Sequence, residues 1–501
     1  MQNNNEKIKI LEKSISEISE MLDRKEISSV ELTKLVLEQI DEIDPEIKAF
    51  ITVCKNEALE QAKEADKRII NGNRLSKLDG VPISIKDLIC TKNIKTTAAS
   101  KMLADFVPAY DATIVERLKN AGAVIVGKTN LDAWAHGSST ENSDFFTTRN
   151  PYNLDYVSGG SSGGSTAAVA SNMGFASVGT DTGGSIRQPA GFCNVVGLKP
   201  TYGRVSRYGI VAMASSLDQA GPFTKTCEDA GILLEVMCGH DTKDSTTIPG
   251  KKFQANKIQK ANFKNQNDNI KLKDLKIGLP KEYFAEGLDS RIKERVIEKV
   301  ELLKKMGAKV KEISLPMTDY ALAVYYILQP AEVSSNLARY DGIRYGYSVA
   351  NDKSQILSIK NLEELYLKNR GEGFGDEAKR RIMLGTYVLS SGYYDAYYKK
   401  AMKVRTLVCE DFKRAFSEVD AIITPTSPTL PFKIGEREQN PLAMYLADVY
   451  TVGANIAGIP GVSIPVGFID ELPVGLQILG PMWSEELILN IGKLIEDRRN
   501  K

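Results

Sequence analysis

The chain has 501 residues, of which 42% are hydrophobic and 26% charged, and these proportions are typical of a folded globular protein. Its 65 basic and 64 acidic residues leave a formal net charge of +1. The chain as a whole therefore lacks the basic excess that favours binding to nucleic acids or to anionic membranes.

Residues 1–75 are expected to form an N-terminal helical segment that packs on the rest of the chain. Ser28 followed by Glu31 is a capping-box pattern, in which the serine hydroxyl and the glutamate carboxylate satisfy the free N–H groups at a helix start. Apolar residues follow at helical spacing, so the pattern predicts a helix that begins just after Ser28.

The cellular location is inferred from the start of the chain and from its cysteines. The first residues contain no apolar signal segment, and no apolar run reaches transmembrane length. The six cysteines form no CxxC pair, which argues against a zinc ribbon or a redox motif. We therefore expect a cytoplasmic protein with reduced thiols, without a membrane anchor and without a bound metal.

From residue 76 the chain alternates short apolar runs with helical segments. Runs typical of buried strands occupy 81–89, 123–129, 175–182, 195–201, 275–280, 308–316, 421–426, 461–468 and 474–481. Helical patterns occupy 113–122, 165–174 and 290–307, and a closing helix starts at Ser484. This alternation predicts the α/β class: one large domain over 76–501 with a central mixed β-sheet covered by helices on both faces.

Two segments depart from this alternation. Residues 250–274 are rich in Lys, Asn and Gln and poor in large apolar residues, so we expect an exposed polar loop there. Residues 320–450 are rich in tyrosine and mainly helical, and we expect them to pack over one side of the sheet.

Two glycine- and serine-rich loops interrupt the predicted strands and helices. They read SGGSSGGSTAAVA at 158–170 and GTDTGGSIRQPAG at 179–191. Such a loop between a strand and a helix presents backbone N–H groups that can stabilise an anion, including the oxyanion of acyl transfer. Neither loop matches the GxxxxGK[ST] or GxGxxG phosphate patterns, although one such loop alone could be a structural turn.

A lysine and two histidines are the candidate bases. Lys86 interrupts the apolar run VPISIKDLI, where it is either an edge-strand charge, a partner of Asp87, or a desolvated lysine whose lowered pKa lets it act as a general base. The chain has two histidines, so a Ser-His-Asp hydrolase would have to use one of them. His240 follows a predicted helix and suits a surface position, whereas His136 lies in a polar loop and stays open as a base.

The sequences PISIKD, GGSSGGS and GTDTGGSIRQPAGFCNVVGLKPT resemble those of the amidase signature family, and the similarity extends over nearly the whole chain. The resemblance implies a Ser-cisSer-Lys triad. Ser185 would be the nucleophile, Ser161 the bridging serine after a cis peptide bond, and Lys86 the base. An oxyanion hole would be formed by the backbone N–H groups of Thr182, Gly183, Gly184 and Ser185.

The C-terminal half resembles the branch of this family whose members release ammonia from glutamine for a tRNA-dependent amidotransferase. This resemblance places Arg381 on the glutamine carboxylate, Asp448 on its ammonium group and Tyr325 in the pocket wall. Arg380 is an adjacent candidate for the arginine. Asp448 has small apolar neighbours, and a carboxylate in such surroundings needs a partner or a ligand.

The same resemblance implies partners rather than cofactors in this chain. Two further subunits, B and C, would complete a heterotrimer, ATP and Mg²⁺ would bind to the larger one, and tRNA would be contacted through the complex. The product would be amidated Glu-tRNA(Gln), with Asp-tRNA(Asn) left open. A free-standing amidase acting on small amides is the alternative, and a catalytically silent scaffold is a third reading that the intact Lys86, Ser161 and Ser185 disfavour.

Overall fold

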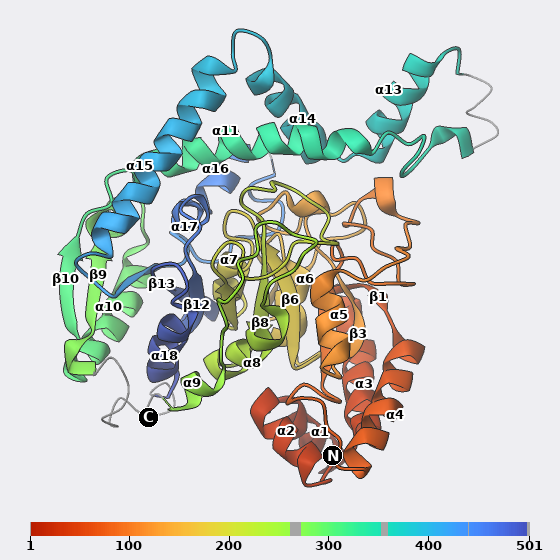
Figure 1. The fold of residues 1–501 in the computed structure, drawn as a ribbon, viewed down its shortest axis with the longest axis vertical. Coiled ribbons are helices and arrows are strands. Elements are labelled where there is room, and N and C mark those ends of the chain that lie inside the picture. The colour runs from red at the N-terminus through yellow and green to blue at the C-terminus, as the bar shows by residue number, and fades with distance from the viewer. Residues whose placement is uncertain (1, 261–271, 352–358, 439, 498–501) are drawn as a thin grey trace.

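A mixed eleven-stranded sheet runs through the centre of the computed structural model, which describes residues 2–260, 272–351, 359–438 and 440–497 (Figure 1). In spatial order its strands are β1 (Phe50–Val53), β3 (Val124–Thr129), β2 (Pro82–Lys86), β6 (Ala176–Asp181), β8 (Gln219–Thr224), β7 (Val196–Lys199), β12 (Gly461–Ile469), β13 (Leu472–Leu479), β11 (Ala421–Pro425), β9 (Lys276–Pro280) and β10 (Lys309–Ile313). The predicted α/β class with a mixed sheet is confirmed.

Two groups of parallel strands explain the continuous apolar runs in the sequence. Strand β2 pairs in parallel with β3 and β6, and β9 pairs in parallel with β10 and β11, whereas the remaining pairs are antiparallel. Every residue of β2, β3 and β6 is buried, as expected for parallel strands covered on both faces. Because these three strands run in the same direction, their carboxyl ends meet at one edge of the sheet.

Helices cover both faces of the sheet, as the neighbours of β12 illustrate. Ser463 lies next to Gly191 of α7 (Arg187–Phe192), whereas Ile464 lies next to Gly492 of α18 (Glu485–Glu496). Successive side chains of a strand point to opposite faces, so α7 and α18 lie on opposite sides of the sheet. The other helices around the sheet are α5 (Thr113–Asn120), α6 (Gly163–Ala170), α8 (Cys227–Met237), α10 (Ser290–Lys305) and α17 (Val452–Ile456).

The N-terminal segment is helical, with one strand that the sequence did not predict. Its helices are α1 (Gln2–Leu11), α2 (Ile15–Asp23), α3 (Ser29–Ile47) and α4 (Lys55–Ile70), and the capping box of Ser28 and Glu31 is formed at the start of α3. Between α3 and α4, β1 adds to the sheet edge by antiparallel pairing with β3. The segment is therefore part of the main sheet rather than only packed on it.

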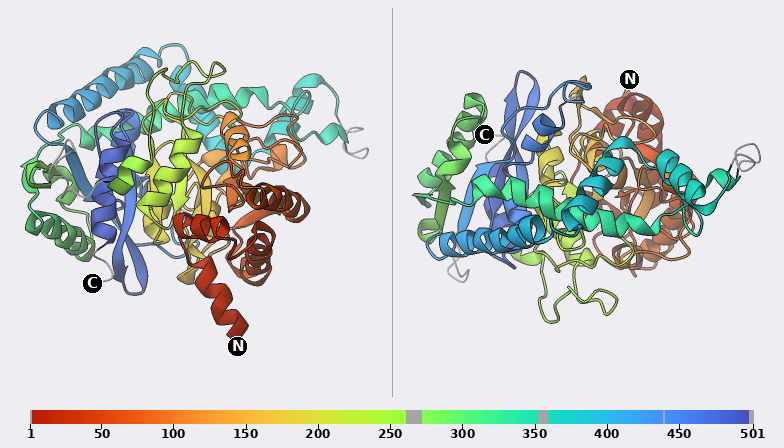
Figure 2. Two further views of the ribbon diagram at one scale, coloured as in Figure 1. Left: turned by 60° about the horizontal axis from the view of Figure 1, so that its bottom comes forward. Right: turned by 90° about the horizontal axis from the view of Figure 1, so that it is seen from above.

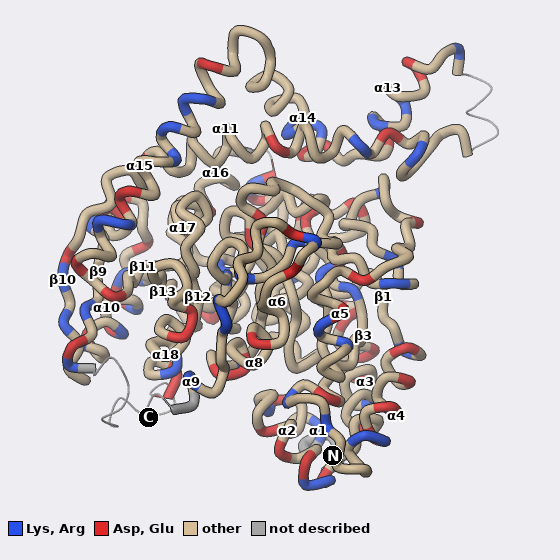
Figure 3. The backbone as a smooth tube through the Cα atoms, viewed as in Figure 1, with Lys and Arg blue, Asp and Glu red and all other residues tan. Residues whose placement is uncertain are grey.

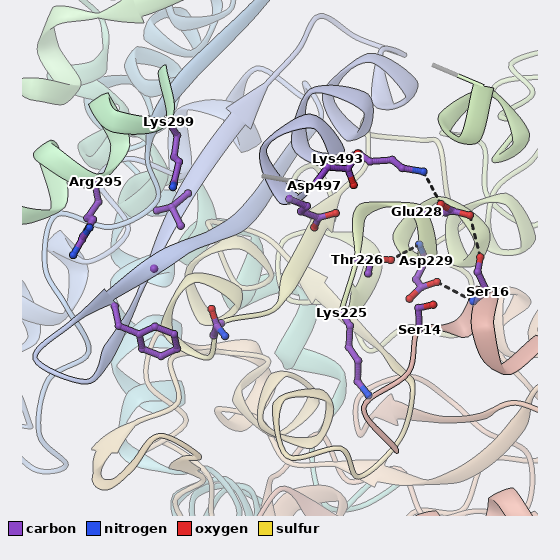
Figure 4. Close-up of a pocket in the computed structure, with 15 residues that line it drawn as sticks. Ser14, Ser16, Lys225, Thr226, Glu228, Asp229, Arg295, Lys299, Lys493 and Asp497 are labelled. Carbon is purple, nitrogen blue, oxygen red and sulfur yellow. Dashed lines mark hydrogen bonds and ion pairs between the residues drawn. The ribbon is translucent and has the colours of Figure 1, made fainter. Parts of the chain in front are cut away.

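Helix α2 is attached to the main domain through α8. The Asp229 carboxylate accepts hydrogen bonds from the N–H groups of Ile15 and Ser16, at 3.1 and 3.2 Å, and so satisfies free donors at the start of α2. Glu228 bonds to Ser16 and to Lys493 of α18. Figure 4 shows the contacts of Ser16 and Lys493 at the edge of a cavity of about 880 Å³ that reaches toward α10 and β12.

The tyrosine-rich region forms a layer of helices across one edge of the sheet, at the top of Figure 1. We call α11 (Thr318–Asn336), α13 (Leu362–Gly373), α14 (Asp376–Leu389) and α15 (Lys400–Ala415) the cap helices. They follow β10 and precede β11, so the whole layer is one long connection between two strands of the sheet. Figure 2 shows from above how α11, α14 and α15 extend over the strands.

The expected polar loop over 250–274 differs from the structure in its described part. Residues Asn256–Lys260 form the short helix α9, and the side chains of Phe253, Ala255 and Ile258 are buried. Residues 261–271 lie outside the described part of the chain. Three apolar residues among many polar ones are too weak a pattern to predict that these side chains are buried.

Charged residues are distributed unevenly between the outer helices and the central strands. Basic and acidic residues alternate along outer helices such as α4 and α10, while the central strands carry few of either (Figure 3). Across the described residues we find no helix that is both long and apolar enough to span a membrane.

Candidate active site

Lys86 is the last residue of β2 and points into a ring of hydroxyl groups. Its Nζ lies 2.8 Å from the Ser161 Oγ, 2.8 Å from the Ser162 Oγ and 3.0 Å from the Thr180 Oγ1. Burial of this fully enclosed side chain lowers its pKa to about 7, although the carboxylates of Asp132, Asp181 and Asp218 act in the opposite direction. A neutral amine, which can accept a proton, is therefore accessible near neutral pH.

The two structural interpretations of Lys86 are wrong. Strand β2 lies between β3 and β6, so Lys86 is not on an edge strand. Its neighbour Asp87 pairs instead with Lys128, at 3.4 Å.

Ser161 sits in the first glycine-serine loop, immediately before α6. The peptide bond between Gly160 and Ser161 is cis, as the resemblance implied, and so is the bond between Gly137 and Ser138. The N–H of Asp132 donates to the Ser161 carbonyl at 3.2 Å, and the Gly160 N–H donates to the Gln188 side chain at 3.1 Å. A side chain at position 160 would collide with Asp132, so the loop requires glycine there.

Ser185 sits in the second loop, between β6 and α7, and the Asp181 carboxylate holds that loop. It accepts hydrogen bonds from the N–H groups of Gly184 and Ile186, at 2.9 and 3.1 Å, and forms a buried ion pair with Arg187 at 3.0 Å. Burial alone would raise the pKa of Asp181, but the Arg187 guanidinium lowers it to about 2. Asp181 is therefore a permanent anion that fixes the turn carrying Ser185.

Arg187 ties this turn to two further segments. Its Nη1 donates to the Thr451 carbonyl at 3.0 Å and to the Gln477 side chain of β13 at 2.6 Å. The guanidinium is completely buried, and all of these contacts are to the protein itself. The ion pair between Asp181 and Arg187 thus has a structural role.

The expected oxyanion donors are not equivalent in this structure. The Gly184 N–H is committed to Asp181, whereas the N–H groups of Thr182, Gly183 and Ser185 have no hydrogen-bond partner within the described residues. Within the described residues, the hydroxyls of Ser161 and Ser185 do not form a hydrogen bond with each other. Catalytic hydrogen bonds commonly tighten only when substrate is bound, so this geometry leaves both roles open.

Tyr325 and Asp448 both lie against the Ser185 loop. The Tyr325 ring of α11 packs directly on Gly183, so closely that a side chain at position 183 would overlap its hydroxyl end. The Thr451 hydroxyl lies 2.6 Å from the Gly183 carbonyl and 3.0 Å from the Asp448 carbonyl, and it can donate to either. The segment that carries Asp448 is therefore anchored to the catalytic loop.

Asp448 and Arg381 are buried charges that meet at Tyr326. The Tyr326 hydroxyl donates to the Asp448 carboxylate at 3.4 Å, and the Arg381 guanidinium lies 4.7 Å from the centre of the Tyr326 ring. Burial raises the pKa of Asp448 to about 8; the charge of Asp181 acts in the same direction and Arg381 opposes it. The carboxylate is thus short of positive partners, as a site for a cationic group would be.

Arg381 rather than Arg380 faces this pocket. Arg381 is 1% exposed and donates to Glu377 at 2.6 Å and to Gln329 at 2.7 Å. Arg380 is largely exposed on the same helix and pairs with the other Glu377 oxygen. The structure therefore brings Tyr325, Arg381 and Asp448 together beside the loop of Ser185.

Comparison with known proteins gives the family. The model of the amidase family matches residues 31–489, which is most of the chain. The chain belongs to the amidase signature family. The family resemblance seen in the sequence is thereby confirmed.

Among members of the amidase signature family, the chain is similar to several named for one activity. It is 54% identical to the A subunit of the glutamyl-tRNA(Gln) amidotransferase from Sulfurihydrogenibium sp. (strain YO3AOP1), over 97% of this chain and 96% of the relative. It is 53% identical to the protein of the same name from Coxiella burnetii (strain Dugway 5J108-111), over 96% of each.

Solved structures from the amidase signature family share the fold. The crystal structure of the A subunit of the Thermotoga maritima glutamyl-tRNA(Gln) amidotransferase matches with a TM-score of 0.77 and 40% identity, covering 97% of this chain and 95% of that one. The native peptide amidase of Stenotrophomonas maltophilia matches with a TM-score of 0.76 and 28% identity, covering 98% and 97%. The family thus uses one architecture for more than one named amidase.

Four residues near the site were not singled out from the sequence: Asp132, Tyr326, Gln329 and Glu377. Two of them had a detectable signal. Gln329 follows Tyr325 by four residues and Glu377 precedes Arg381 by four, so each lies on the same helix face as a predicted pocket residue. Asp132 and Tyr326 had no comparable pattern.

The two histidines differ in their surroundings. His240 is exposed shortly after the end of α8, as expected. His136 is buried, and burial together with the Arg381 charge lowers its pKa well below the usual value. Its ring nitrogens contact no described residue by hydrogen bonding, so it is not positioned as the base of Ser185.

Proposed function

We propose that this chain is the glutaminase component of a tRNA-dependent amidotransferase that converts Glu-tRNA(Gln) to the amidated form. The observation that carries the proposal is the pair of buried opposite charges, Arg381 and Asp448, beside the loop of Ser185. Free glutamine carries an α-carboxylate and an α-ammonium group at a fixed spacing. Arginine offers a planar fork for the first and aspartate a counter-charge for the second. The similar proteins are named as A subunits of a glutamyl-tRNA(Gln) amidotransferase, which supports the same overall reaction.

The proposed reaction begins with proton transfer to the buried lysine. The neutral Lys86 amine accepts the Ser161 hydroxyl proton, and Ser161 accepts the proton of Ser185. The Ser185 Oγ forms a bond to the carboxamide carbon of glutamine. The resulting oxyanion is stabilised by backbone N–H groups of this loop, for which those of Thr182, Gly183 and Ser185 are uncommitted among the described residues.

Collapse of this intermediate breaks the C–N bond. The proton held by Lys86 returns through Ser161 to the leaving nitrogen, so that ammonia departs and an acyl group stays on Ser185. Water then attacks the acyl carbon, gives its proton to the same relay and releases glutamate. The chain supplies every protein group in this cycle.

The remaining steps belong to partner subunits. We expect a larger partner, which binds ATP and Mg²⁺ and activates the glutamyl-tRNA, and a small partner that completes a cytoplasmic heterotrimer. Ammonia released here would pass to the larger partner, and tRNA would be contacted through the assembled complex. The near-neutral charge of this chain agrees with a tRNA contact that lies mostly on a partner.

The test is covalent labelling with 6-diazo-5-oxo-norleucine, a reactive analogue of glutamine, followed by mass measurement of the intact protein and of its peptides. We expect one adduct on Ser185 that is absent from Ser185→Ala. An adduct that forms only after both partner subunits are added would mean that assembly activates the site. Labelling by a generic amide-directed reagent but never by the glutamine analogue would favour a free-standing amidase for small amides.

A further inference from the structure

Several buried polar groups on the loop of His136 and on α11 have no hydrogen-bond partner within the described residues. They are both ring nitrogens of His136, the Oγ of Ser138 and the Nε2 of Gln329. Each of these side chains is at most 1% exposed. Buried polar groups are nearly always hydrogen-bonded, because an unpaired one destabilises the folded state, so such a cluster needs a physical reason.

The Gln329 amide has a fixed orientation that leaves its NH₂ group available. Arg381 can only donate, and its Nη1 lies 2.7 Å from the Oε1 of Gln329. The contact therefore assigns the carbonyl oxygen to the arginine side and turns the NH₂ group away from it. Gln329 thus presents two further N–H donors beside a guanidinium whose Nε is already bound to Glu377.

His136 is held by its backbone, and its side chain is buried. Its N–H donates to the Ala133 carbonyl at 3.1 Å, and its carbonyl accepts from the Asn142 side chain at 2.9 Å. The next residue, Gly137, packs against the backbone of Gly160 and Ser161. The loop of His136 is thus fixed directly on the catalytic loop, and the neutral ring offers one N–H donor and one acceptor.

We propose that His136 and Gln329 complete, with Arg381, a subsite that binds the α-carboxylate of the amino-acid amide substrate. The inference rests on the proposed glutaminase function and names residues that determine its specificity. The three side chains come from different segments, and all can donate hydrogen bonds. Uncommitted N–H donors beside a positive charge suit an anion, whereas the ammonium group is left to Asp448, which accepts from the Tyr326 hydroxyl.

Aromatic rings and a carboxylate surround the Arg381 guanidinium. Tyr445 contacts both Glu377, at 3.1 Å, and the Arg381 guanidinium, at 4.6 Å. The rings of Tyr445 and Tyr326 thus both border the guanidinium that would bind the carboxylate.

The experiment compares two substrates in three variants of the chain, assembled with its partner subunits. The substrates are glutamine and 4-aminobutanamide, which is glutamine without its α-carboxylate. The variants are His136→Leu, Gln329→Met and, as a matched control, His240→Leu. Where 4-aminobutanamide turns over too slowly, its inhibition constant against glutamine replaces kcat/KM.

We expect His136→Leu and Gln329→Met each to raise KM for glutamine by about tenfold or more, the loss typical of a hydrogen bond to a charged group. Their values for 4-aminobutanamide should stay within about twofold of the wild type, and His240→Leu should change neither. An equal loss with both substrates, or no loss with glutamine, would overturn the inference. Wild-type complex that releases no ammonia from glutamine would instead contradict the proposed function itself.

Thermal unfolding separates substrate binding from a structural role. Because the His136 ring has no hydrogen-bond partner among the described residues, its replacement by an apolar side chain of similar size removes an unpaired polar group. The Tm of His136→Leu should therefore equal or exceed that of the wild type. A large fall in Tm would mean that the ring supports the fold and would overturn its assignment to the substrate.

Discussion

Buried charge is compensated at the loop that carries Ser185 but not in the pocket beneath the cap helices. At the loop, Asp181 is paired with Arg187 and accepts several N–H groups, so its charge is fully compensated. In the pocket, Asp448 has one long hydrogen bond from Tyr326 and a raised pKa. The buried carboxylate of the first region is compensated without a ligand, whereas that of the second gains a charged partner only when a ligand binds. The fold itself thus holds the catalytic loop in place, whereas the carboxylate expected to bind the substrate lacks a charged partner in the free protein.

The largest effect should follow from loss of Lys86, the proposed base at the catalytic loop. Lys86→Ala removes the proton acceptor of the relay and should lower kcat by about 10⁴- to 10⁶-fold, the loss that removal of a triad member causes in serine hydrolases. Lys199→Met is the matched control, because burial also lowers the pKa of Lys199 to about 7, yet its Nζ bonds to the Pro200 carbonyl. Ammonia release measures both. Wild-type-like turnover in Lys86→Ala would remove lysine from the mechanism.

The next largest effect should be on the free energy of unfolding. Arg187→Met leaves the Asp181 carboxylate buried without its counter-charge and should lower the free energy of unfolding by about 3–5 kcal/mol. Urea unfolding of the wild type and the variant gives the difference. An unchanged unfolding midpoint would mean that Asp181 is not held as an anion.

The corresponding change in the pocket should have little effect on stability and a clear one on binding. Asp448→Asn removes the charge that would bind the substrate ammonium and should raise KM for glutamine by about 10- to 100-fold. Because burial and the charge of Asp181 disfavour the carboxylate in the free protein, Tm should stay the same or rise. The idea that this pocket is unsatisfied fails if Asp448→Asn unfolds as readily as Arg187→Met.

The smallest effect is a dependence on pH that separates the two regions. With its pKa raised to about 8, Asp448 is protonated in the free protein below that pH, and an ammonium ligand binds the ionised form. Binding therefore releases a proton, so KM for glutamine should fall by up to tenfold per pH unit toward pH 8 and then level off. Lys86, with a pKa of about 7, should limit kcat below neutral pH. Asp448→Asn should abolish only the first dependence.

Most of the sheet could be predicted from the sequence, because buried parallel strands give continuous apolar runs. Strand β8 was not predicted: it contains Gly221 and Pro222, which are unfavourable in strand interiors, although it lies between β6 and β7. Strand β1 was hidden between two strong helical patterns. In both cases pairing with distant strands decides the structure, and local propensity does not report it.

The site residues also differ in how well the sequence predicts them. Lys86, Ser161 and Ser185 occur in motifs, so the sequence indicates them directly. The pocket depends on the arrangement of α11, α14 and the segment of Asp448, which approach one another only in the folded chain. The absence of described hydrogen-bond partners for the His136 ring and the Gln329 NH₂ group is a property of three-dimensional packing, and no spacing in the sequence could reveal it.

The position of the cap helices has an evolutionary consequence. They enter as a single connection between β10 and β11, whereas the catalytic groups lie on β2, on the loop before α6 and on the turn after β6. Substitutions, insertions or deletions in this connection can therefore arise without changing Lys86, Ser161 or Ser185. A library that grafts the β10–β11 connection of other family members onto this chain would test how far selectivity follows Tyr325 and Arg381, which lie within it, rather than His136 and Asp448, which lie outside it.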